Sequence, residues 1–278
     1  GLLADREEDA EIYSAAPSLN QAKIPFNDAE KMLDRAPLLN KRCKRNLNNI
    51  AVERTNSWFR PVSSERRSLD GPRVHFGLID ELHEHRDSAV YDKLRAGTKG
   101  RKQSLIVAIT NSGYDRHSVA WRLHHYSQEI LDGLHTNDAW FAYVCALDPC
   151  ESCRNEGKDQ PTDGCSGCDQ WTDEATWVKA NPNLDVSVTR RYLREQVQEA
   201  LEMPAKQNIV KRLNFCMWTQ QSVRWINLDL WDKGRAPIFP AALTGRRCYL
   251  GLDLARVHDL SALAILFPIV HRNDADID

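Results

Sequence analysis

Short apolar runs alternate with amphipathic stretches along the first half of the chain. Runs rich in β-branched and aromatic residues predict strands at residues 11–15, 49–53, 57–62, 74–79, 105–109 and 140–147. Apolar positions that recur every three or four residues predict helices at residues 19–33, 88–96 and 118–132. Two of the strand runs, FGLI and LIVAI, are apolar without alternation, which is typical of strands covered on both faces. The pattern therefore indicates an α/β fold with a mostly parallel sheet.

The pattern changes after residue 147. Residues 148–170 contain four Cys, three Gly and two Pro, which predicts a small polar insert. Two helices are expected at 189–203 and 205–218, with Pro204 between them. We expect a first domain at 1–218, a connector at 219–247, and the start of a second domain at 248–278, where a hairpin of two apolar strands begins.

Composition adds few constraints. The 278 residues carry a net charge of -2, which neither favours nor excludes nucleic acid, but residues 35–73 contain ten Lys or Arg against three acidic residues. That stretch would contact a phosphate backbone or form an ordinary solvated surface. No apolar run approaches the ~18 residues of a membrane span, so no membrane partner is expected. The eight Cys point to a reducing cytosol, where metal binding is commoner than disulfides.

Two adjacent acidic residues, Asp80 and Glu81, directly follow the apolar run at 74–79. Open α/β sheets bind ligands at the carboxyl ends of their strands. There Asp80 would hold the water shell of an ATP-bound Mg²⁺, and Glu81 would orient the water that attacks the γ-phosphate. The next core strand ends in Thr110 and Asn111, whose polar groups would lie beside the same phosphate. The alternative is two strand ends that merely meet solvent or begin a turn.

Two Cys-x-x-Cys pairs lie in the polar insert, separated by eleven residues, and comprise Cys150, Cys153, Cys165 and Cys168. This spacing predicts a tetrahedral Zn²⁺ site with four thiolate ligands. Because no coordination position stays open, the expected role is structural, and the bound metal would supply folding energy that this polar insert lacks. The alternative is a set of unliganded surface thiols.

The chain resembles the large subunit of tailed-bacteriophage terminases, the ATP-driven motors and nucleases that package viral DNA. The resemblance covers roughly residues 1–270 and is carried by the blocks AEIYSAAPSLNQAKIPFNDAEKM, FRPVSSERRSLDGPRVHFGLIDELHEH, LIVAITNSG, TWVKANPNLDVSV and CYLGLDLARVHDLSALAILF. It implies that Asp80 and Glu81 are the Walker B pair of an ATPase core of the P-loop type. It also implies that Thr110, with Asn111 and Gly113 beside it, forms the coupling motif, and that the insert is similar to a zinc ribbon.

The same resemblance assigns the hairpin at 248–267 to the start of an RNase H-like nuclease domain. Asp253, which ends its first apolar run, would be the first ligand of a Mg²⁺ or Mn²⁺ ion, and Asp259 is a weaker candidate. The alternative for Asp253 is an acid satisfied by backbone groups at a turn. The remaining carboxylates of such a site would lie on later strands, so we expect no DNA cleavage by this chain alone.

One departure from the family pattern is the phosphate-binding loop. The chain contains no G-x-x-x-x-G-K-[ST] sequence. In the family this loop precedes a helix that residues 1–4 would complete, so we expect a chain truncated at both ends that binds ATP poorly. A degenerate prophage remnant would show the same absence.

Several other residues bear on the site. Surface or supporting roles are expected for His83 and His85, and a helix surface for His124 and His125. An arginine finger or a DNA contact is expected of one of Arg60, Arg66 and Arg67. Packing roles near the domain junction are expected for Trp171, Trp177, Trp218, Trp225 and Trp231.

The functional expectation is an ATP-driven DNA translocase joined to a metal-dependent endonuclease, in the cytoplasm of a bacterial host. The resemblance implies double-stranded DNA, a small terminase subunit, a portal protein and a homo-oligomeric ring as partners. The alternatives are another P-loop machine such as a helicase, or a zinc-bearing DNA-binding protein or prophage remnant without turnover.

Overall fold

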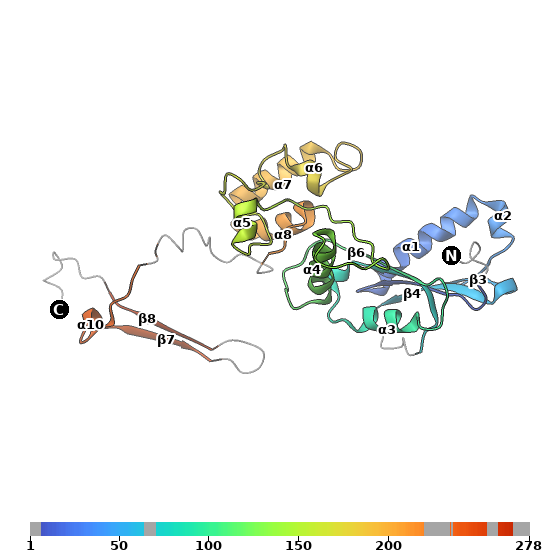
Figure 1. The fold of residues 1–278 in the computed structure, drawn as a ribbon, viewed down its shortest axis with the longest axis horizontal. Coiled ribbons are helices and arrows are strands. Elements are labelled where there is room, and N and C mark those ends of the chain that lie inside the picture. Colours follow the sequence, from blue (N-terminus) through green and yellow to red (C-terminus); the bar gives the residue numbers. More distant parts are fainter. Residues whose placement is uncertain (1–6, 64–70, 220–233, 235, 255–260, 269–278) are drawn as a thin grey trace. The chain divides into compact units, whose positions relative to one another are not determined.

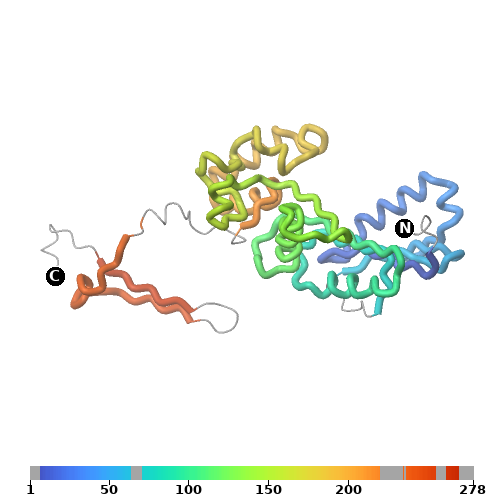
Figure 2. Tube along the Cα trace, viewed as in Figure 1, coloured from blue at the N-terminus to red at the C-terminus, as the bar shows by residue number. Residues whose placement is uncertain are grey.

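The computed structural model describes residues 7–63, 71–219, 234, 236–254 and 261–268, and the chain divides into two compact units, Gly1–Trp225 and Ile226–Asp278. The first unit holds the elements from β1 to α8, and the second holds α10, β7 and β8 (Figures 1 and 2). Among the described helices, none combines the length and the apolar character needed to cross a lipid bilayer.

A six-stranded sheet forms the centre of the first unit. Its strands are β1 (Glu11–Ala16), β2 (Lys44–Asn46), β3 (Asn49–Val52), β4 (Ser57–Ser63), β5 (Val74–Asp80) and β6 (Leu105–Ile109). They lie in the order β2-β3-β4-β1-β5-β6, in which β4, β1, β5 and β6 are parallel and β2 and β3 form an antiparallel edge. The predicted α/β fold with a mostly parallel sheet is confirmed.

Helices cover both faces of this sheet. The chain passes from β1 through α1 (Leu19–Asp34) to β4, and from β5 through α3 (Ala89–Gly97) to β6, in opposite directions along the sheet. Right-handed crossovers in opposite directions place their helices on opposite faces, and Figure 1 shows α1 and α3 on opposite sides of the sheet. In β5, Val74 and Ile79 are 0% exposed. The expected coverage on both faces is wrong for LIVAI, because β6 is an edge strand in which Leu105 and Ile109 are 55% and 51% exposed.

Local sequence explains where α1 begins and what it buries. Ser18 and Gln21 form a capping box, in which the Ser18 Oγ accepts from the Gln21 backbone N–H and the Gln21 Oε1 accepts from the Ser18 backbone N–H. Phe26 and Leu33 then pack with Ile50 of β3 in a small separate core. The short helix α2 (Pro37–Asn40) and strand β2, which were not predicted, connect α1 to this edge of the sheet.

The second part of the first unit is helical and has its own core. It contains α5 (Glu151–Asn155), α6 (Trp177–Ala180), α7 (Arg190–Glu202) and α8 (Pro204–Phe215), and α4 (Val119–Leu131) precedes it. Thr189 caps α7 by accepting from the Tyr192 backbone N–H, and Leu193 on α7 is fully buried. Its core also includes Trp177 and Phe215, which are 1% and 0% exposed.

The described part of the second unit is a hairpin with one short helix. Strands β7 (Tyr249–Asp253) and β8 (Ala262–Leu266) pair antiparallel, and Asp253 lies opposite Ala262. The helix α10 (Pro240–Leu243) precedes them. The hairpin predicted at residues 248–267 is therefore present.

Three further structural expectations are wrong. Residues 140–147 form no strand, because a strand needs a pairing neighbour and no described strand pairs with this segment. The second helix of the helical part ends at Phe215 and not at Trp218, since Cys216 adopts a left-handed conformation with φ 51°. Residues 148–170 contain α5 and turns in place of the strands of a ribbon.

Some sequence predictions fall outside the described residues. These are the helix end at residues 1–4, the arginines Arg66 and Arg67, the acid Asp259, and the tryptophans Trp225 and Trp231.

Replacing Gly97, the last residue of α3, with Ala should lower the free energy of unfolding by about 1–3 kcal/mol. A Cβ there would lie 2.6 Å from the Pro72 carbonyl oxygen and 2.7 Å from Val74 Cγ2, so the end of α3 would have to move away from the start of β5. Urea unfolding measures the change. The control is Ala96→Ser at the preceding, exposed position, which should cost about 0.5 kcal/mol; equal losses in both variants would contradict the close approach.

Candidate functional site

The predicted acid pair and the predicted threonine lie next to each other. Strands β5 and β6 are parallel neighbours, and Asp80 pairs with Ile109 in their register. Their carboxyl ends therefore meet at one edge of the sheet, where Glu81 follows one strand and Thr110 follows the other. The edge carries carboxylate and hydroxyl groups at the place where α/β sheets bind ligands.

Glu81 has an unusual backbone conformation. Its φ and ψ are 50° and 48°, in the left-handed region that side chains other than glycine rarely adopt. The turn is closed by Asp80, whose Oδ1 accepts from the Glu81 backbone N–H at 3.0 Å, and the short 3-10 helix Leu82–Glu84 follows. Such conformations cost about 1–3 kcal/mol and concentrate at functional sites.

His83 connects the two strand ends. Its backbone N–H donates to Thr110 Oγ1 at 2.9 Å, and its Nδ1 lies 2.9 Å from the same oxygen and 3.2 Å from Glu81 Oε2. The Thr110 hydroxyl donates to the Asn111 carbonyl oxygen at 2.9 Å, and the His83 Nε2 lies 3.1 Å from Glu84 Oε1, so the ring lies between the carboxylates of Glu81 and Glu84. With its side chain 3% exposed, His83 is not a surface residue, and of its two predicted roles only the supporting one fits.

His85 supports the same turn from the other side. Its Nε2 lies 3.1 Å from the Asp80 carbonyl oxygen, and the residue is 6% exposed. Burial lowers the pKa of both His83 and His85, which favours their neutral forms. The surface role is therefore wrong for His85 as well. Residues two positions apart lie on different faces of a helix, which is the reason to expect surface roles. His83 and His85 lie in a tight turn, where that argument does not hold.

The environment of Glu81 raises its pKa. Burial is the largest cause, and the neighbouring carboxylates of Asp80 and Glu84 act in the same direction. A carboxylate with a raised pKa is a stronger base than a free one, which suits it to accept a proton from a bound water. The acid pair therefore combines a group that can hold a hydrated cation with a group that can activate water.

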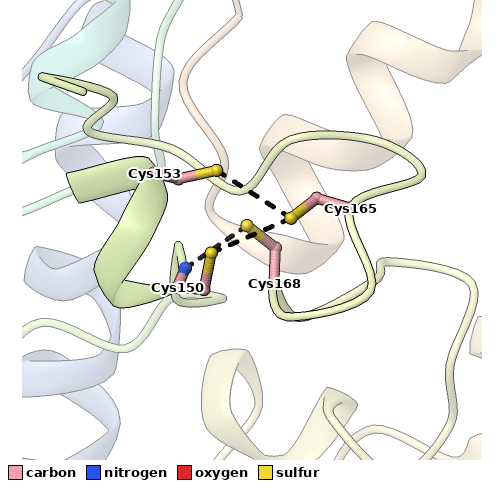
Figure 3. A group of neighbouring side chains, drawn as sticks. All are labelled: Cys150, Cys153, Cys165 and Cys168. Carbon is pink, nitrogen blue, oxygen red and sulfur yellow. Dashed lines mark hydrogen bonds between the residues drawn. The ribbon is translucent and has the colours of Figure 1, made fainter. Parts of the chain in front are cut away.

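The four predicted cysteine ligands converge on one point. Their sulfur atoms lie within 4.8 Å of one another, and Figure 3 shows the side chains pointing toward a common centre. Cys165 Sγ lies 3.8 Å from Cys150 Sγ and 3.9 Å from Cys153 Sγ. Four Zn–S bonds of ~2.3 Å in a tetrahedron give S···S distances of about 3.8 Å, so the cluster fits a zinc ion.

The protein around the cluster fits a metal centre as well. The Gln170 Nε2 donates to the carbonyl oxygens of Thr162, Cys165 and Cys168, which fixes the second Cys pair. A Cβ on Gly167 would lie 3.1 Å from Cys150 Cβ and 3.3 Å from Cys150 Sγ, so the two pairs approach closely at this position. These supporting contacts are of the kind that orient metal ligands.

The protonation of the cysteines favours a bound cation. Donation from the Ser152 hydroxyl and the Cys153 backbone N–H lowers the pKa of Cys150 to about 6. Although the Thr162 hydroxyl acts in the lowering direction, burial and the other thiols raise the pKa of Cys153 to about 11. The Cys150 thiolate thus opposes ionisation of Cys153, and a bound cation would offset this repulsion.

The described part of the second unit contains one of the predicted nuclease metal ligands. Asp253 ends β7 and is exposed. It is the only acidic residue in the described part of this unit, residues 234, 236–254 and 261–268. A metal held by several carboxylates is therefore not assembled by these residues alone.

The other predicted residues have mixed outcomes. Arg60 stacks on Trp58, with its guanidinium carbon 4.1 Å from the ring centre. The packing role is confirmed for the buried residues Trp171, Trp177 and Trp218. His125 is exposed as expected, but the surface role is wrong for His124, whose ring lies 5.6 Å from that of Trp218. Burial lowers the pKa of His124 to about 4.

Comparison with protein families gives two matches that together cover most of the chain. Residues 1–129 match the ATPase domain of terminase large subunits, and residues 165–274 match the endonuclease domain of the same proteins. The domain boundaries expected at residues 218 and 248 remain predictions.

Individual relatives agree with these matches. The chain is 31% identical to Protein YmfN of Escherichia coli K12 over 219 residues, which are 78% of the chain and 44% of that protein. It is 23% identical to the terminase large subunit of enterobacteria phage HK97 over 263 residues, which are 93% of the chain and 47% of that protein. The chain thus spans about half the length of these relatives.

A solved structure shares the fold. The crystal structure of the HK97 large terminase is similar with a TM-score of 0.62 at 22% identity, over 95% of this chain and 51% of that one.

Replacing Glu81 with Gln should make the free energy of unfolding less sensitive to pH. Because the native pKa of Glu81 is raised above 4.5, its neutral form stabilises the fold, and that contribution is lost as pH rises through the native pKa. The variant should therefore gain stability relative to the wild type between about pH 4 and about pH 7. Urea unfolding across this range measures the difference, and exposed Glu8→Gln is the control. A difference that does not change with pH would contradict the raised pKa.

Proposed function

Because the chain belongs to the terminase large subunit family, we propose that its first unit is part of an ATP-driven motor that moves viral DNA into a capsid. The proposal extends to the second unit as part of the metal-dependent endonuclease that cuts the DNA. The observation that carries the motor proposal is the junction of Asp80, Glu81 and Thr110 at one edge of a parallel sheet.

Each residue at this edge has a proposed task in ATP hydrolysis. Asp80 is the group that would hold Mg²⁺ through its water shell, and a bound Mg²⁺ supplies neutralisation of phosphate charge. Glu81 orients a water molecule and accepts its proton, for which its raised pKa is suited. His83 holds the carboxylate of Glu81 beside Thr110. Thr110 and Asn111 respond to the state of the nucleotide.

The phosphate-binding groups are not provided by this sequence. It contains no G-x-x-x-x-G-K-[ST] loop, whose backbone N–H groups and lysine bind phosphates in such enzymes. Hydrolysis is therefore proposed for a polypeptide in which these residues are joined to such a loop.

The cysteine cluster is proposed as a structural Zn²⁺ site with Cys150, Cys153, Cys165 and Cys168 as ligands. The S···S distances and the converging side chains support this assignment (Figure 3). With four thiolates bound, the metal has no open position for catalysis, so it serves to fix the insert.

For the second unit, Asp253 is proposed as a ligand of the nuclease Mg²⁺ or Mn²⁺, and Asp259 as a weaker one. The position of Asp253 at the end of β7 supports this role. The proposed partners are double-stranded DNA, a small terminase subunit, a portal protein and further copies of the motor in a ring, and the proposed location is the cytoplasm of a bacterial host.

In a polypeptide that joins these residues to a phosphate-binding loop, Glu81→Gln should reduce the rate of ATP hydrolysis at least about 100-fold. Nucleotide affinity should stay within about threefold, because Gln keeps the size of the side chain and relieves repulsion from Asp80. Hydrolysis is measured by phosphate release and affinity by fluorescent nucleotide binding. Glu53→Gln, on the far edge of the sheet, is the control. Hydrolysis that survives Glu81→Gln would refute the role of Glu81 as the base. A wild-type polypeptide that does not hydrolyse ATP would favour the alternative of a degenerate prophage remnant.

Purified under reducing conditions, the chain should contain about one zinc ion, measured by elemental analysis. Cys165→Ser should lose the metal and lower the melting temperature, because the polar insert then lacks its main source of folding energy. Cys248→Ser removes an exposed free thiol of the second unit and should change neither quantity. A well-folded chain without metal would contradict the site.

A further inference from the structure

The end of β6 is bonded to the segment that follows α8. Ser112, which is 4% exposed, donates through its hydroxyl to the Met217 carbonyl oxygen at 2.9 Å. The Thr219 backbone N–H donates to the Gly113 carbonyl oxygen at 3.2 Å. A Cβ on Gly113 would lie 3.0 Å from the Trp218 ring, so the two segments are in close contact. The position of residues 217–219 therefore bears directly on the strand end that carries Thr110.

The loop between the two cysteine pairs contacts the same region at three places. Gln160 Oε1 accepts from the Trp218 backbone N–H at 2.9 Å. Asp159 receives two bonds of 2.9 Å from the guanidinium of Arg116, three residues after Gly113. Asp163 Oδ2 lies 2.6 Å from the Lys211 Nζ on α8.

The Lys211 contact is shielded from water on one side, since the Asp163 side chain is 36% exposed. The Lys211 side chain is 8% exposed, and its ammonium lies 5.1 Å from the centre of the Trp171 ring. The Lys211 ammonium would lose its ion partner if the Asp163 carboxylate were removed, at the boundary between the loop and α8. This ion pair therefore fixes the loop against α8 more firmly than a surface pair would.

The loop has little structure of its own to hold these contacts. Residues 156–170 contain no helix or strand. The cysteine cluster holds these residues in place, together with the hydrogen bonds that Gln170 donates to the carbonyl oxygens of residues 162, 165 and 168. The conformation that presents Asp159, Gln160 and Asp163 thus depends on the ligand positions of the cluster.

We propose that residues 159–163 are a metal-dependent positioning element, which holds residues 217–219 against the end of β6 and so sets the place of Thr110 and His83 relative to Glu81. The metal dependence rests on the zinc site proposed above. The positioning itself rests on the three contacts and on the bonds of Ser112 and Gly113. Asp159, Gln160 and Asp163 act through other residues, since none of them contacts the acid pair.

The test compares Asp163→Asn, alone and with Gln160→Ala, with the wild-type chain. NMR measures amide exchange at Thr219 and in α7, and the ring-nitrogen signals of His83; elemental analysis measures zinc. Both variants should retain zinc, exchange the Thr219 amide at least about tenfold faster, shift the His83 signals and leave the α7 amides unchanged. Asp163→Glu should restore slow exchange. Removal of zinc from the wild type should reproduce the effects at Thr219 and His83.

The matched control is Glu156→Gln, which breaks an ion pair to Lys158 inside the same loop and should behave as the wild type. Unchanged exchange at Thr219 and unchanged His83 signals in the zinc-bearing double variant would overturn the proposal. Faster exchange throughout α7 would also overturn it, because the loop would then stabilise the fold as a whole. If the purified chain holds no zinc, both the proposed zinc site and the metal dependence are refuted. The positioning role is then decided separately, by the change in amide exchange at Thr219 in Asp163→Asn.

Discussion

The parallel pairing of β5 with β6 is the constraint on which the candidate site depends. Because Asp80 pairs with Ile109, the residues that follow the two strands become neighbours, and the turn after Asp80 brings His83 onto Thr110. A shift of one residue would turn every side chain of β5 to the opposite face. Burial of Val74 and Ile79, which share a core with Leu94 of α3, opposes that shift. The geometry of the site is thus set by packing several residues away from the chemistry.

That dependence explains which parts the sequence could predict. An apolar run bounded by polar residues marks both β5 and β6, so these strands and the residues after them could be placed from the chain alone. The run alone did not show that β6 is an exposed edge strand. The choice between the surface and the supporting role of His83 could not be made from the chain, because it follows from the left-handed conformation of Glu81, which no local pattern signals. Residues 140–147 show the opposite failure: their pattern favours a strand, but a strand also requires a partner, which the pattern does not encode.

The cysteine cluster also has features that the sequence predicts and features that it does not. Spacing alone predicts four ligands, since each Cys-x-x-Cys pair can chelate one side of a tetrahedral ion. Spacing does not show that Asp163 pairs with Lys211, which is 48 residues away, or that Gln160 bonds to Trp218. Those contacts exist because the core around Trp177 and Phe215 brings α8 back beside the insert. The metal ligands can be recognised from local sequence, whereas the contacts of the loop with α8 and Trp218 depend on the fold.

The energetic balance at the acid pair follows from these observations. The left-handed backbone at Glu81 and the repulsion from Asp80 and Glu84 both oppose the observed arrangement. Against them act the bonds of His83 to Thr110 and the close contact of Gly113 with Trp218. The backbone strain and the charge repulsion are confined to the turn after β5. Weakening the contacts of His83 and Gly113 should therefore first release that turn and leave the buried sheet intact. A site held in this way can respond to events at the end of β6 without unfolding, as the proposed coupling of hydrolysis to movement would require.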